Sequence, residues 1–190
     1  MHVKIHPRKS RLTGFLAAVF FFAVTFCGLA VTYTVTDLGA LTNVTAQTDA
    51  TVSAINFAGK ACGITASNIT YQSFIYGGSR TNLGTLGGAN CRAQGINSSN
   101  VICGGSTTAG GADHAFRWTP GANNGVPGNP QMKDLGTLGA GSASDSFDIN
   151  ASGQIAGVAT VDMFDNVFHA CRFNTNGTVT DISTVATPAI

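Results

Sequence analysis

The strongest constraint on how this chain folds is an internal repeat. A motif of the form Asp/Asn-Leu-Gly-x-Leu occurs at 37–41, 82–86 and 134–138, and a shorter echo follows at Asp181-Ile182. Self-similarity at this spacing indicates one supersecondary unit copied along the chain, with each copy burying its apolar face against its neighbours. The repeat therefore favours a modular fold over a single irregular core.

Two further landmarks follow the motif in the same order in each copy. The first is an Ile-Asn pair with a glycine at a fixed interval after it, and the second is a segment centred on aromatic residues. Together the landmarks define repeats of about 37–81, 82–133 and 134–180, followed by a partial strand over 181–190. The pairs are Ile55-Asn56, Ile96-Asn97 and Ile149-Asn150, their glycines are Gly63, Gly104 and Gly157, and the aromatic segments are 72–76, 114–118 and 169–173.

These landmarks predict a hairpin in every copy. Three residues after each Asn stands Gly59, Asn100 or Gly153, residue types that accept a positive φ in a tight turn. The Asn side chain can bond to backbone two residues on, as an Asx-turn. Apolar and β-branched residues flank each turn, so strands are expected on both sides.

The aromatic segment is expected to form a third strand, and the stretch that leads into Asp-Leu-Gly a fourth. We therefore predict an all-β fold of three four-stranded antiparallel blade-like repeats, a partial or open β-propeller. Val31–Leu38 alternates like the fourth strand of an earlier unit, and the Pro- and Gly-rich stretch Pro120–Pro130 is expected to be an exposed loop.

The front of the chain has the order of a secretory signal. Lys4, Arg8, Lys9 and Arg11 precede the apolar run 14–31, and Gly28 and Ala30 suit a cut after Ala30. Residues 1–30 are thus predicted to be a signal peptide, with an uncleaved membrane-anchor helix as the alternative because the run approaches the length that spans a bilayer. Either interpretation places the body, residues 31–190, outside the cytoplasm: secreted, in the cell envelope, or membrane-anchored.

The charge balance argues against nucleic acid as a partner. Four of the ten Lys and Arg residues stand in the leader, which leaves six scattered singly against nine acidic residues, all of them Asp. Binding to phosphates needs clustered basic side chains. The expected partner is instead a protein or a surface polymer of unknown identity, and contact with a membrane is expected only through an uncleaved leader.

Four cysteines remain in the body, and export permits disulfides between them. Their pairing is open, because four cysteines allow three connectivities. Metal binding is the weaker interpretation, since no two lie at C-x-x-C spacing. Cys62 and Cys103 share a repeat position at which the third copy has Ala156, which a small buried side chain explains equally well. The possible disulfide cysteines are Cys62, Cys91, Cys103 and Cys171.

No catalytic residue, metal ligand or cofactor is predicted. Asp37, Asp134 and Asp181 occupy a repeat position where Asn82 stands without a charge, and His114 and His169 are also equivalent, so structural roles are favoured for both sets. The chain contains no nucleophile elbow, phosphate loop or H-E-x-x-H pair. A hydrolase would need the non-repeated acids to converge in one cleft. These are Asp49, Asp113, Asp145, Asp148, Asp162 and Asp165.

The repeated motifs resemble those of the bacterial extracellular HAF-repeat family. The resemblance is carried by Asp-Leu-Gly-Thr-Leu-Gly at 134–139, Ile-Asn-x-x-Gly-x-Ile-x-Gly at 149–157 and His-Ala-Phe-x-Trp at 114–118. The third copy departs from His-Ala-Phe at Cys171, and the first copy departs at Gln72 and Ser73. The resemblance implies exported, β-rich, propeller-like proteins and transfers no catalytic residue.

Two function classes follow. The first is an exported non-catalytic β-repeat scaffold that binds a ligand through its loops; the alternative is an extracellular polymer (glycan) hydrolase that uses the non-repeated Asp residues. Three blades also leave open sheet edges. We expect either a curved stack capped by loops or two chains that complete a six-blade ring, with Val31–Leu38 of one chain completing a blade of the other.

Overall fold

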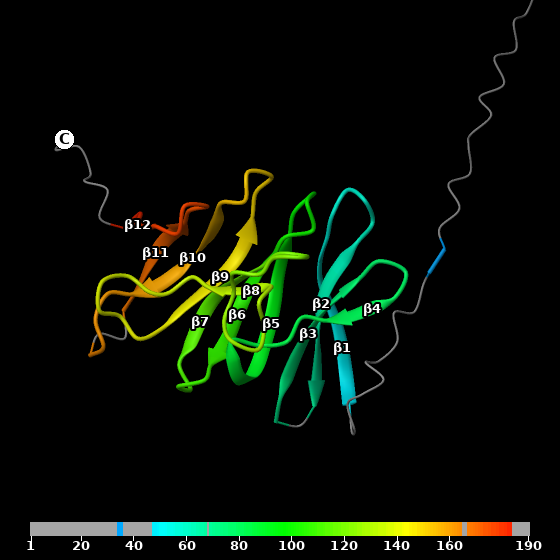
Figure 1. Ribbon diagram of the computed structural model, residues 1–190, viewed down its shortest axis with the longest axis horizontal. Helices are drawn as coiled ribbons and strands as arrows, with labels where there is room; N and C mark the ends of the chain where they lie inside the picture. The colour runs from blue at the N-terminus through cyan, green and yellow to red at the C-terminus, as the bar shows by residue number, and fades with distance from the viewer. Residues whose placement is uncertain (1–33, 36–46, 68, 165–166, 184–190) are drawn as a thin grey trace, which may run out of the picture. The chain divides into compact units, whose positions relative to one another are not determined.

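The computed structural model describes residues 34–35, 47–67, 69–164 and 167–183. These residues form an all-β structure of twelve strands in three four-stranded antiparallel sheets (Figure 1). The chain divides into two units, Met1–Thr36 and Asp37–Ile190, and all three sheets belong to the second. The predicted fold class is confirmed at the level of three repeated four-stranded sheets.

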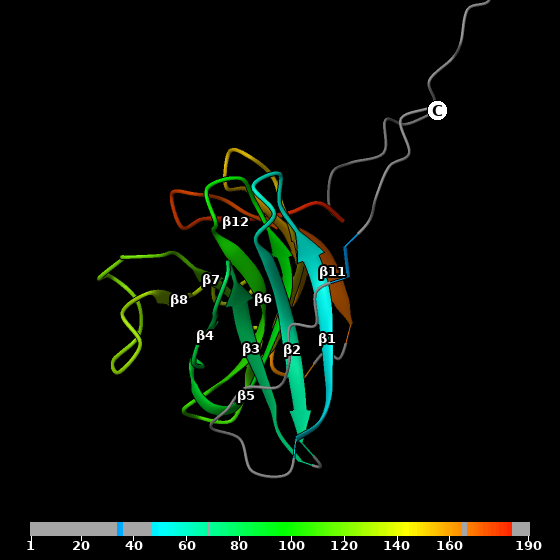
Figure 2. The same ribbon diagram turned by 90° about the vertical axis from the view of Figure 1, so that its right-hand side faces the viewer.

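Each sheet is a simple meander in which consecutive strands pair side by side (Figures 1 and 2). The aromatic segments form the third strands, and the residues leading into Asp/Asn-Leu-Gly form the fourth, as predicted. The first sheet contains β1 (Gln47–Ile55), β2 (Ala61–Ser67), β3 (Tyr71–Tyr76) and β4 (Arg80–Asn82); the second contains β5 (Gly87–Ile96), β6 (Ile102–Thr108), β7 (Asp113–Trp118) and β8 (Met132–Asp134); the third contains β9 (Ser144–Ile149), β10 (Ile155–Thr160), β11 (Phe168–Phe173) and β12 (Val179–Asp181).

The first two strands of every sheet meet in the predicted hairpin turn. Gly59, Asn100 and Gly153 have φ of 75°, 63° and 79°, the left-handed conformation that the turn requires. In the first two turns the Asn side chain accepts from the backbone N–H two residues on, at 3.1 Å for Asn56 and 3.0 Å for Asn97. The Asx-turn that the repeat predicts is therefore present in these two sheets.

The repeated glycine on the second strand lies where the first strand passes very close. A Cβ placed on Gly63, Gly104 or Gly157 would lie 2.1, 1.9 or 2.1 Å from a backbone oxygen of the first strand. Each pair of strands also carries a bulge near this point. Steric exclusion by the neighbouring backbone explains why glycine recurs at this position.

Apolar side chains fill the spaces between consecutive sheets, which lie side by side in Figure 1. One core cluster joins Cys62 and Leu83 of the first sheet and its connection to Ile96, Phe116 and Trp118 of the second. A second cluster joins Cys103 and Ala115 of the second sheet to residues of the third. The second sheet therefore has core residues on both sides. The second cluster includes Leu135, Leu138, Ile149, Ile155 and Phe173.

The Asp/Asn-Leu-Gly motif closes one sheet and leads to the next. Asn82, Asp134 and Asp181 are each the last residue of a fourth strand, so each copy of the motif begins inside the preceding sheet rather than at the start of a new one. The long loop after β7 is largely exposed, as predicted, but it also folds back. Val126 packs against the first core cluster, and the Asn129 amide donates to the carbonyl oxygen of Leu83 at 2.8 Å.

Several predicted features lie outside the described residues. These include the leader 1–30, the first Asp-Leu-Gly copy at 37–41, and all of Val31–Leu38 except Thr34 and Val35, which carry no strand. The partial strand expected over 181–190 is described only to Ser183, and Asp181 belongs to β12. Within the described ranges, no helix is long and apolar enough to cross a membrane.

Candidate functional site

A polar pair joins the third and fourth strands at the same place in each sheet. In the second sheet, Nδ1 of His114 lies 2.9 Å from Oδ2 of Asp134, and in the third sheet Nδ1 of His169 lies 2.8 Å from Oδ2 of Asp181. In the first sheet the Asn82 amide donates to Oε1 of Gln72 at 3.0 Å. We call these three pairs the strand clasps. They assign the His of the third strand and the Asp of Asp-Leu-Gly to one structural role.

The acidic or amide member of each clasp also holds the turn that follows. Oδ1 of Asn82 accepts from the Gly84 N–H at 2.9 Å, and Oδ1 of Asp134 accepts from the Gly136 N–H at 2.8 Å. Asp181 accepts from the Ser183 N–H at 2.9 Å in the same way. This Asx geometry explains why only Asp and Asn occur at this position among the three clasps.

The His114–Asp134 clasp shifts the protonation of both partners. The hydrogen bond that His114 donates to Asp134 raises the pKa of His114, against an opposing effect of burial. Burial acts to raise the pKa of Asp134, but the hydrogen bonds from His114 and Gly136 and the charge of His114 together lower it. The clasp is therefore strongest when His114 is a cation and Asp134 an anion.

The hairpin asparagines link consecutive sheets. The Asn56 amide donates to the carbonyl oxygen of Asn97 at 3.0 Å, and the Asn97 amide donates to the carbonyl oxygen of Asn150 at 3.2 Å. We call this series the asparagine ladder. The Asn150 amide instead donates to Oε1 of Gln154 in its own turn at 2.9 Å. The hairpin Asn of the first and second sheets thus bonds to the sheet that follows it in the chain, whereas the hairpin Asn of the third sheet bonds within its own turn.

Other side chains add to the links between sheets. The guanidinium of Arg117 on β7 donates to the carbonyl oxygen of Gly153 in the third-sheet turn. Oγ of Ser73 accepts from the Ala93 N–H at 2.7 Å, and Oγ of Ser144 accepts from the Ala115 N–H at 2.9 Å. These bonds satisfy buried backbone donors between strands of different sheets, a requirement for burying them.

The four body cysteines are all buried free thiols in the structure. Burial raises the pKa of Cys62, Cys91 and Cys171 to about 11, and that of Cys103 to about 12. Such thiols are poor nucleophiles near neutral pH because the thiolate is the reactive form. The predicted possibility of disulfides stays a prediction, and the packing role proposed for Cys62 and Cys103 agrees with their place in the core clusters.

Two of the non-repeated acids meet at one basic residue. The guanidinium of Arg92 lies 3.9 Å from Oδ2 of Asp113 and 3.8 Å from Oδ2 of Asp145. Burial raises the pKa of Asp145, although Arg92 opposes this effect. This Arg92 triad joins the second sheet to the third.

The remaining non-repeated acids are separated. Asp49 lies on β1 of the first sheet, and Asp162 lies after β10, where its Oδ1 accepts from the Phe164 N–H at 2.8 Å. Asp148 lies on β9, where it accepts from the Ile149 N–H at 2.8 Å. Asp165 lies outside the described residues. The structure therefore brings together Asp113 and Asp145, and it leaves Asp49 on the first sheet and Asp162 in the loop after β10.

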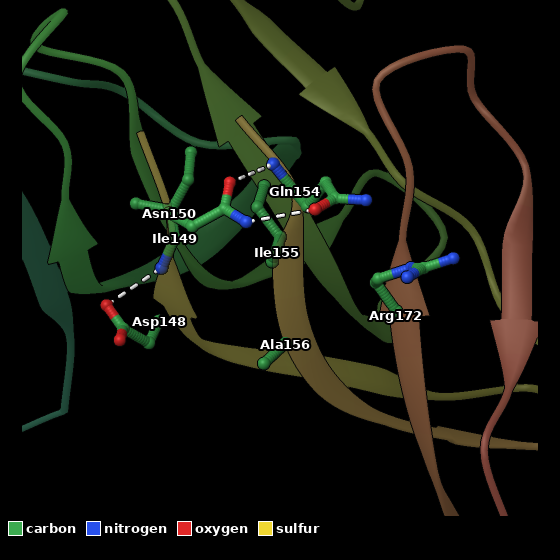
Figure 3. A pocket seen from close by; sticks show the side chains of 7 residues that line it. All are labelled: Asp148, Ile149, Asn150, Gln154, Ile155, Ala156 and Arg172. Carbon is green, nitrogen blue, oxygen red and sulfur yellow. Dashed lines mark hydrogen bonds between the residues drawn. The ribbon is translucent and has the colours of Figure 1, made fainter. Parts of the chain in front are cut away.

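The described residues form pockets beside the first-to-second sheet connection and beside the Asn150 turn, and neither Asp113 nor Asp145 lines these two. One pocket, of about 490 Å³, lies between the first-to-second sheet connection and the Pro127–Asn129 part of the long loop. A pocket of about 160 Å³ lies on the third sheet beside the Asn150 turn (Figure 3). Figure 3 shows Asn150 and Gln154 bonded to each other at its edge, with Arg172 on the neighbouring strand.

No group of three or more His, Cys, Asp or Glu side chains in the part of the chain described is placed to hold a metal ion. The clasps each bring together one imidazole and one carboxylate. Among the described residues, no Ser, Thr or Cys side chain hydrogen-bonds to either imidazole, so these pairs do not form a triad of the Ser-His-Asp type.

Sequence reasoning missed the arginines that act at the boundaries between sheets. Arg117 and Arg172 share a repeat position, one residue before the aromatic residue, Trp118 or Phe173, that ends the third-strand segment. That recurrence was a usable signal, although only Arg117 bonds across a sheet boundary and Arg172 bonds locally to Asn174. The other two copies have no arginine at the position of Arg92. Its contacts with Asp113 and Asp145 depend on how the sheets pack, so the repeat did not indicate them.

Comparison with known protein families, with curated proteins and with solved structures finds no match to this chain.

Proposed function

We propose that this chain is an exported, non-catalytic β-repeat scaffold whose three sheets are blades of an open propeller-like array. The observation that carries the proposal is that the recurring polar side chains are engaged within the fold. The His and Asp positions form the strand clasps, and the Asn position forms the turns and the asparagine ladder. The resemblance to HAF-repeat proteins supports the same interpretation.

We place the binding surface on the three hairpin turns, which lie at the same end of the sheets (Figure 1). The exposed residues of these turns are uncharged. Phe57 is fully exposed, and Ser98, Ser99 and Ser152 offer hydroxyl groups beside it along the row. An aromatic ring with neighbouring neutral hydrogen-bonding groups suits an uncharged polymer, such as a neutral surface glycan, better than a charged one.

Co-sedimentation of the chain with insoluble neutral polysaccharides tests the binding proposal. The chain should pellet with at least one such polymer, and Phe57→Ala should weaken binding by about tenfold because it removes an anchor ring. Ile69→Ala is the matched control, since Ile69 is also an exposed apolar residue but lies at the opposite end of the first sheet, in the turn after β2. Equal binding by both variants would contradict the proposed surface.

The alternative function, a glycan hydrolase, is favoured by one observation, the convergence of Asp113 and Asp145 on Arg92. A hydrolase that used this pair would release reducing ends from a polymer, and Asp145→Asn would abolish the release. If the chain is a scaffold, neither the native chain nor Asp145→Asn should release reducing ends. Turnover that is lost in Asp145→Asn would replace the scaffold with the enzyme.

Export is the remaining part of the proposal, supported by the order of basic and apolar residues in the leader. Expression in a bacterial host and N-terminal sequencing of the protein outside the cytoplasm should give Val31 as the first residue. Recovery of the intact leader in a membrane fraction would support the anchor instead, and recovery in the cytoplasm would contradict export.

A further inference from the structure

The first and the third sheet each have one exposed face. The equivalent face of the second sheet is buried against a neighbouring sheet. On the first sheet, Val52 and Ile55 are 51% and 68% exposed, whereas their equivalents on the second, Ala93 and Ile96, are 0% and 8% exposed. The equivalents on the third sheet, Ser146 and Ile149, are buried as well. In the second and third sheets these positions pack toward the preceding sheet.

The opposite face is uncovered on the third sheet. Ala156 is exposed, although Cys62 and Cys103 at the same repeat position are fully buried. Ile182 is 48% exposed, whereas its equivalents Leu83 and Leu135 are 2% and 9% exposed. At the equivalent positions of the first two sheets, these residues pack toward the following sheet.

The uncovered faces carry hydrogen-bonding groups that are complementary. Within the chain, each inter-sheet contact has an Asn amide donating to the next turn's Asn carbonyl, and Arg117 adds a bond to Gly153. On the third sheet the equivalent donors are Asn150 and Arg172, which bond locally to Gln154 and Asn174. On the first sheet the equivalent acceptors are the carbonyl oxygens of Asn56 and Gly59.

We propose that the third sheet of one copy docks on the first sheet of a second copy, repeating the contact that already joins consecutive sheets. Asn150 would extend the asparagine ladder to the Asn56 carbonyl of the second copy, and Arg172 would donate to its Gly59 carbonyl. Ile55 would cover Ala156, as Ile149 lies in one core cluster with Cys103. The pocket of about 160 Å³ beside Asn150 receives the turn of the second copy (Figure 3).

The two faces differ, so the contact is heterologous and one copy can use both of its faces at once. Two copies that do so form a ring of six sheets, within the range of blade numbers that propellers adopt. Such a ring removes both uncovered faces, which satisfies the physical requirement to cover apolar sheet surfaces. The association does not require a ligand at the hairpin turns.

Sedimentation velocity of the chain without its leader, from Val31, tests the proposal at micromolar concentration. We expect a dimer, and Ile55→Asp and Arg172→Glu should each raise its dissociation constant by tenfold or more. Ile69→Asp is the control, because it adds the same charge to an exposed apolar position in the turn after β2. A monomer at every concentration, or equal weakening by the control, would overturn the proposal.

A cysteine cross-link identifies the faces involved. Equal amounts of an Ile55→Cys chain and an Ala156→Cys chain are mixed and oxidised, and a covalent two-chain product should exceed that of either chain alone by at least tenfold. Each variant alone provides the control for other cysteine pairs. If the unmixed chains cross-link equally well, the two faces do not meet and the proposed contact is wrong.

Coverage of the first face by the chain's own residues 36–46 is the rival outcome. It would give a monomer in which Ile55→Asp lowers the free energy of unfolding. That result overturns the docking proposal but leaves glycan binding at Phe57 unaffected, so the two proposals fail separately.

Discussion

The second sheet and the first carry the same repeat, yet equivalent residues have different surroundings in the two. Ile96 is buried against the first sheet, whereas Ile55 is largely exposed, and both precede an Asn that forms the same turn. The comparison shows that the local structure of a copy is set by its own sequence, whereas the burial of its residues depends on which copy stands next to it. Paired substitutions at equivalent positions can separate these contributions.

The largest difference is expected from Ile96→Ala and Ile55→Ala. Ile96→Ala should lower the free energy of unfolding by about 3 kcal/mol because it opens a cavity in the first core cluster. Ile55→Ala should change it by less than about 0.5 kcal/mol in a dilute single copy. Urea unfolding followed by the fluorescence of Trp118, the only tryptophan, measures both. Equal losses would show that the first face is covered in the single copy.

The repeated glycine should be nearly as sensitive. Gly104→Ala places a Cβ 1.9 Å from the carbonyl oxygen of Arg92, so β5 and β6 must move apart at a cost of about 2–3 kcal/mol. Gly110→Ala is the matched control, since a Cβ there meets its nearest atom at 3.8 Å. Thermal unfolding by circular dichroism compares the two, and similar melting temperatures would refute the steric explanation of the repeat.

The asparagine ladder provides a smaller contrast. Asn97→Ala removes two acceptor bonds within its turn and the donor bond to Asn150, so a loss of about 2 kcal/mol is expected. Asn150→Ala removes bonds only from an exposed turn and should cost about half as much. Urea unfolding of the two variants in dilute solution checks this order. A greater loss for Asn150→Ala would contradict the structural role of the ladder.

The clasps allow a charged pair in the second sheet to be compared with the neutral pair of the first sheet. The double variant His114→Gln with Asp134→Asn gives the second sheet the neutral clasp of the first. Because the pKa of His114 is raised, its stabilising contribution is complete below about pH 6.5 and is lost as the pH rises through the raised value. Because the pKa of Asp134 is lowered, its contribution is present above about pH 3.8 and is lost as the pH falls through the lowered value.

The stabilising effect of the native clasp should thus be greatest between about pH 4 and pH 6.5. There it should exceed that of the neutral clasp by less than about 1 kcal/mol, since both groups are partly exposed. Urea unfolding at pH 3, 5 and 8 gives the difference between the chains at each pH. The His169–Asp181 clasp is common to both and cancels. A difference that does not change with pH would contradict the charged clasp.

The smallest effect concerns reactivity rather than stability. At pH 8 the buried body thiols should react with Ellman's reagent only after urea is added, because their pKa values lie at about 11 to 12. Ala156→Cys supplies an exposed thiol at the repeat position of Cys62 and Cys103, and it should react at once. Failure of the native cysteines to react even in urea would show that they are disulfide-bonded.

Much of each sheet could be predicted from local signals. The positive φ at Gly59, Asn100 and Gly153 follows from the residues that permit it, and the third and fourth strands follow from the recurring segments. The sequence contained a signal for the clasp, because the first copy replaces both partners together: Gln72 stands at the His position and Asn82 at the Asp position of the other copies. Its geometry still required the register of antiparallel strands.

The contacts between sheets could not be predicted in the same way. The Asn56 amide bonds to a carbonyl oxygen 41 positions away in the chain, and Arg92 meets acids from two different strands. Such contacts depend on the spacing and orientation of neighbouring sheets, to which no local pattern corresponds. For the same reason, the sequence offered no means of choosing Asp113 and Asp145 from the non-repeated acids.

The direction of the asparagine ladder has a consequence for how such a chain can evolve. The Asn56 and Asn97 amides both donate forward along the chain to a main-chain oxygen, which every amino acid possesses, and the Asn56 amide donates in addition to Oδ1 of Asn100. A whole unit gained or lost by gene duplication or deletion therefore preserves the main-chain bonds of the ladder, while turn residues outside these bonds, such as Ser98 and Ser99, are free to change their side chains. The number of units in a chain and the side chains that its turns present to a ligand can therefore vary separately.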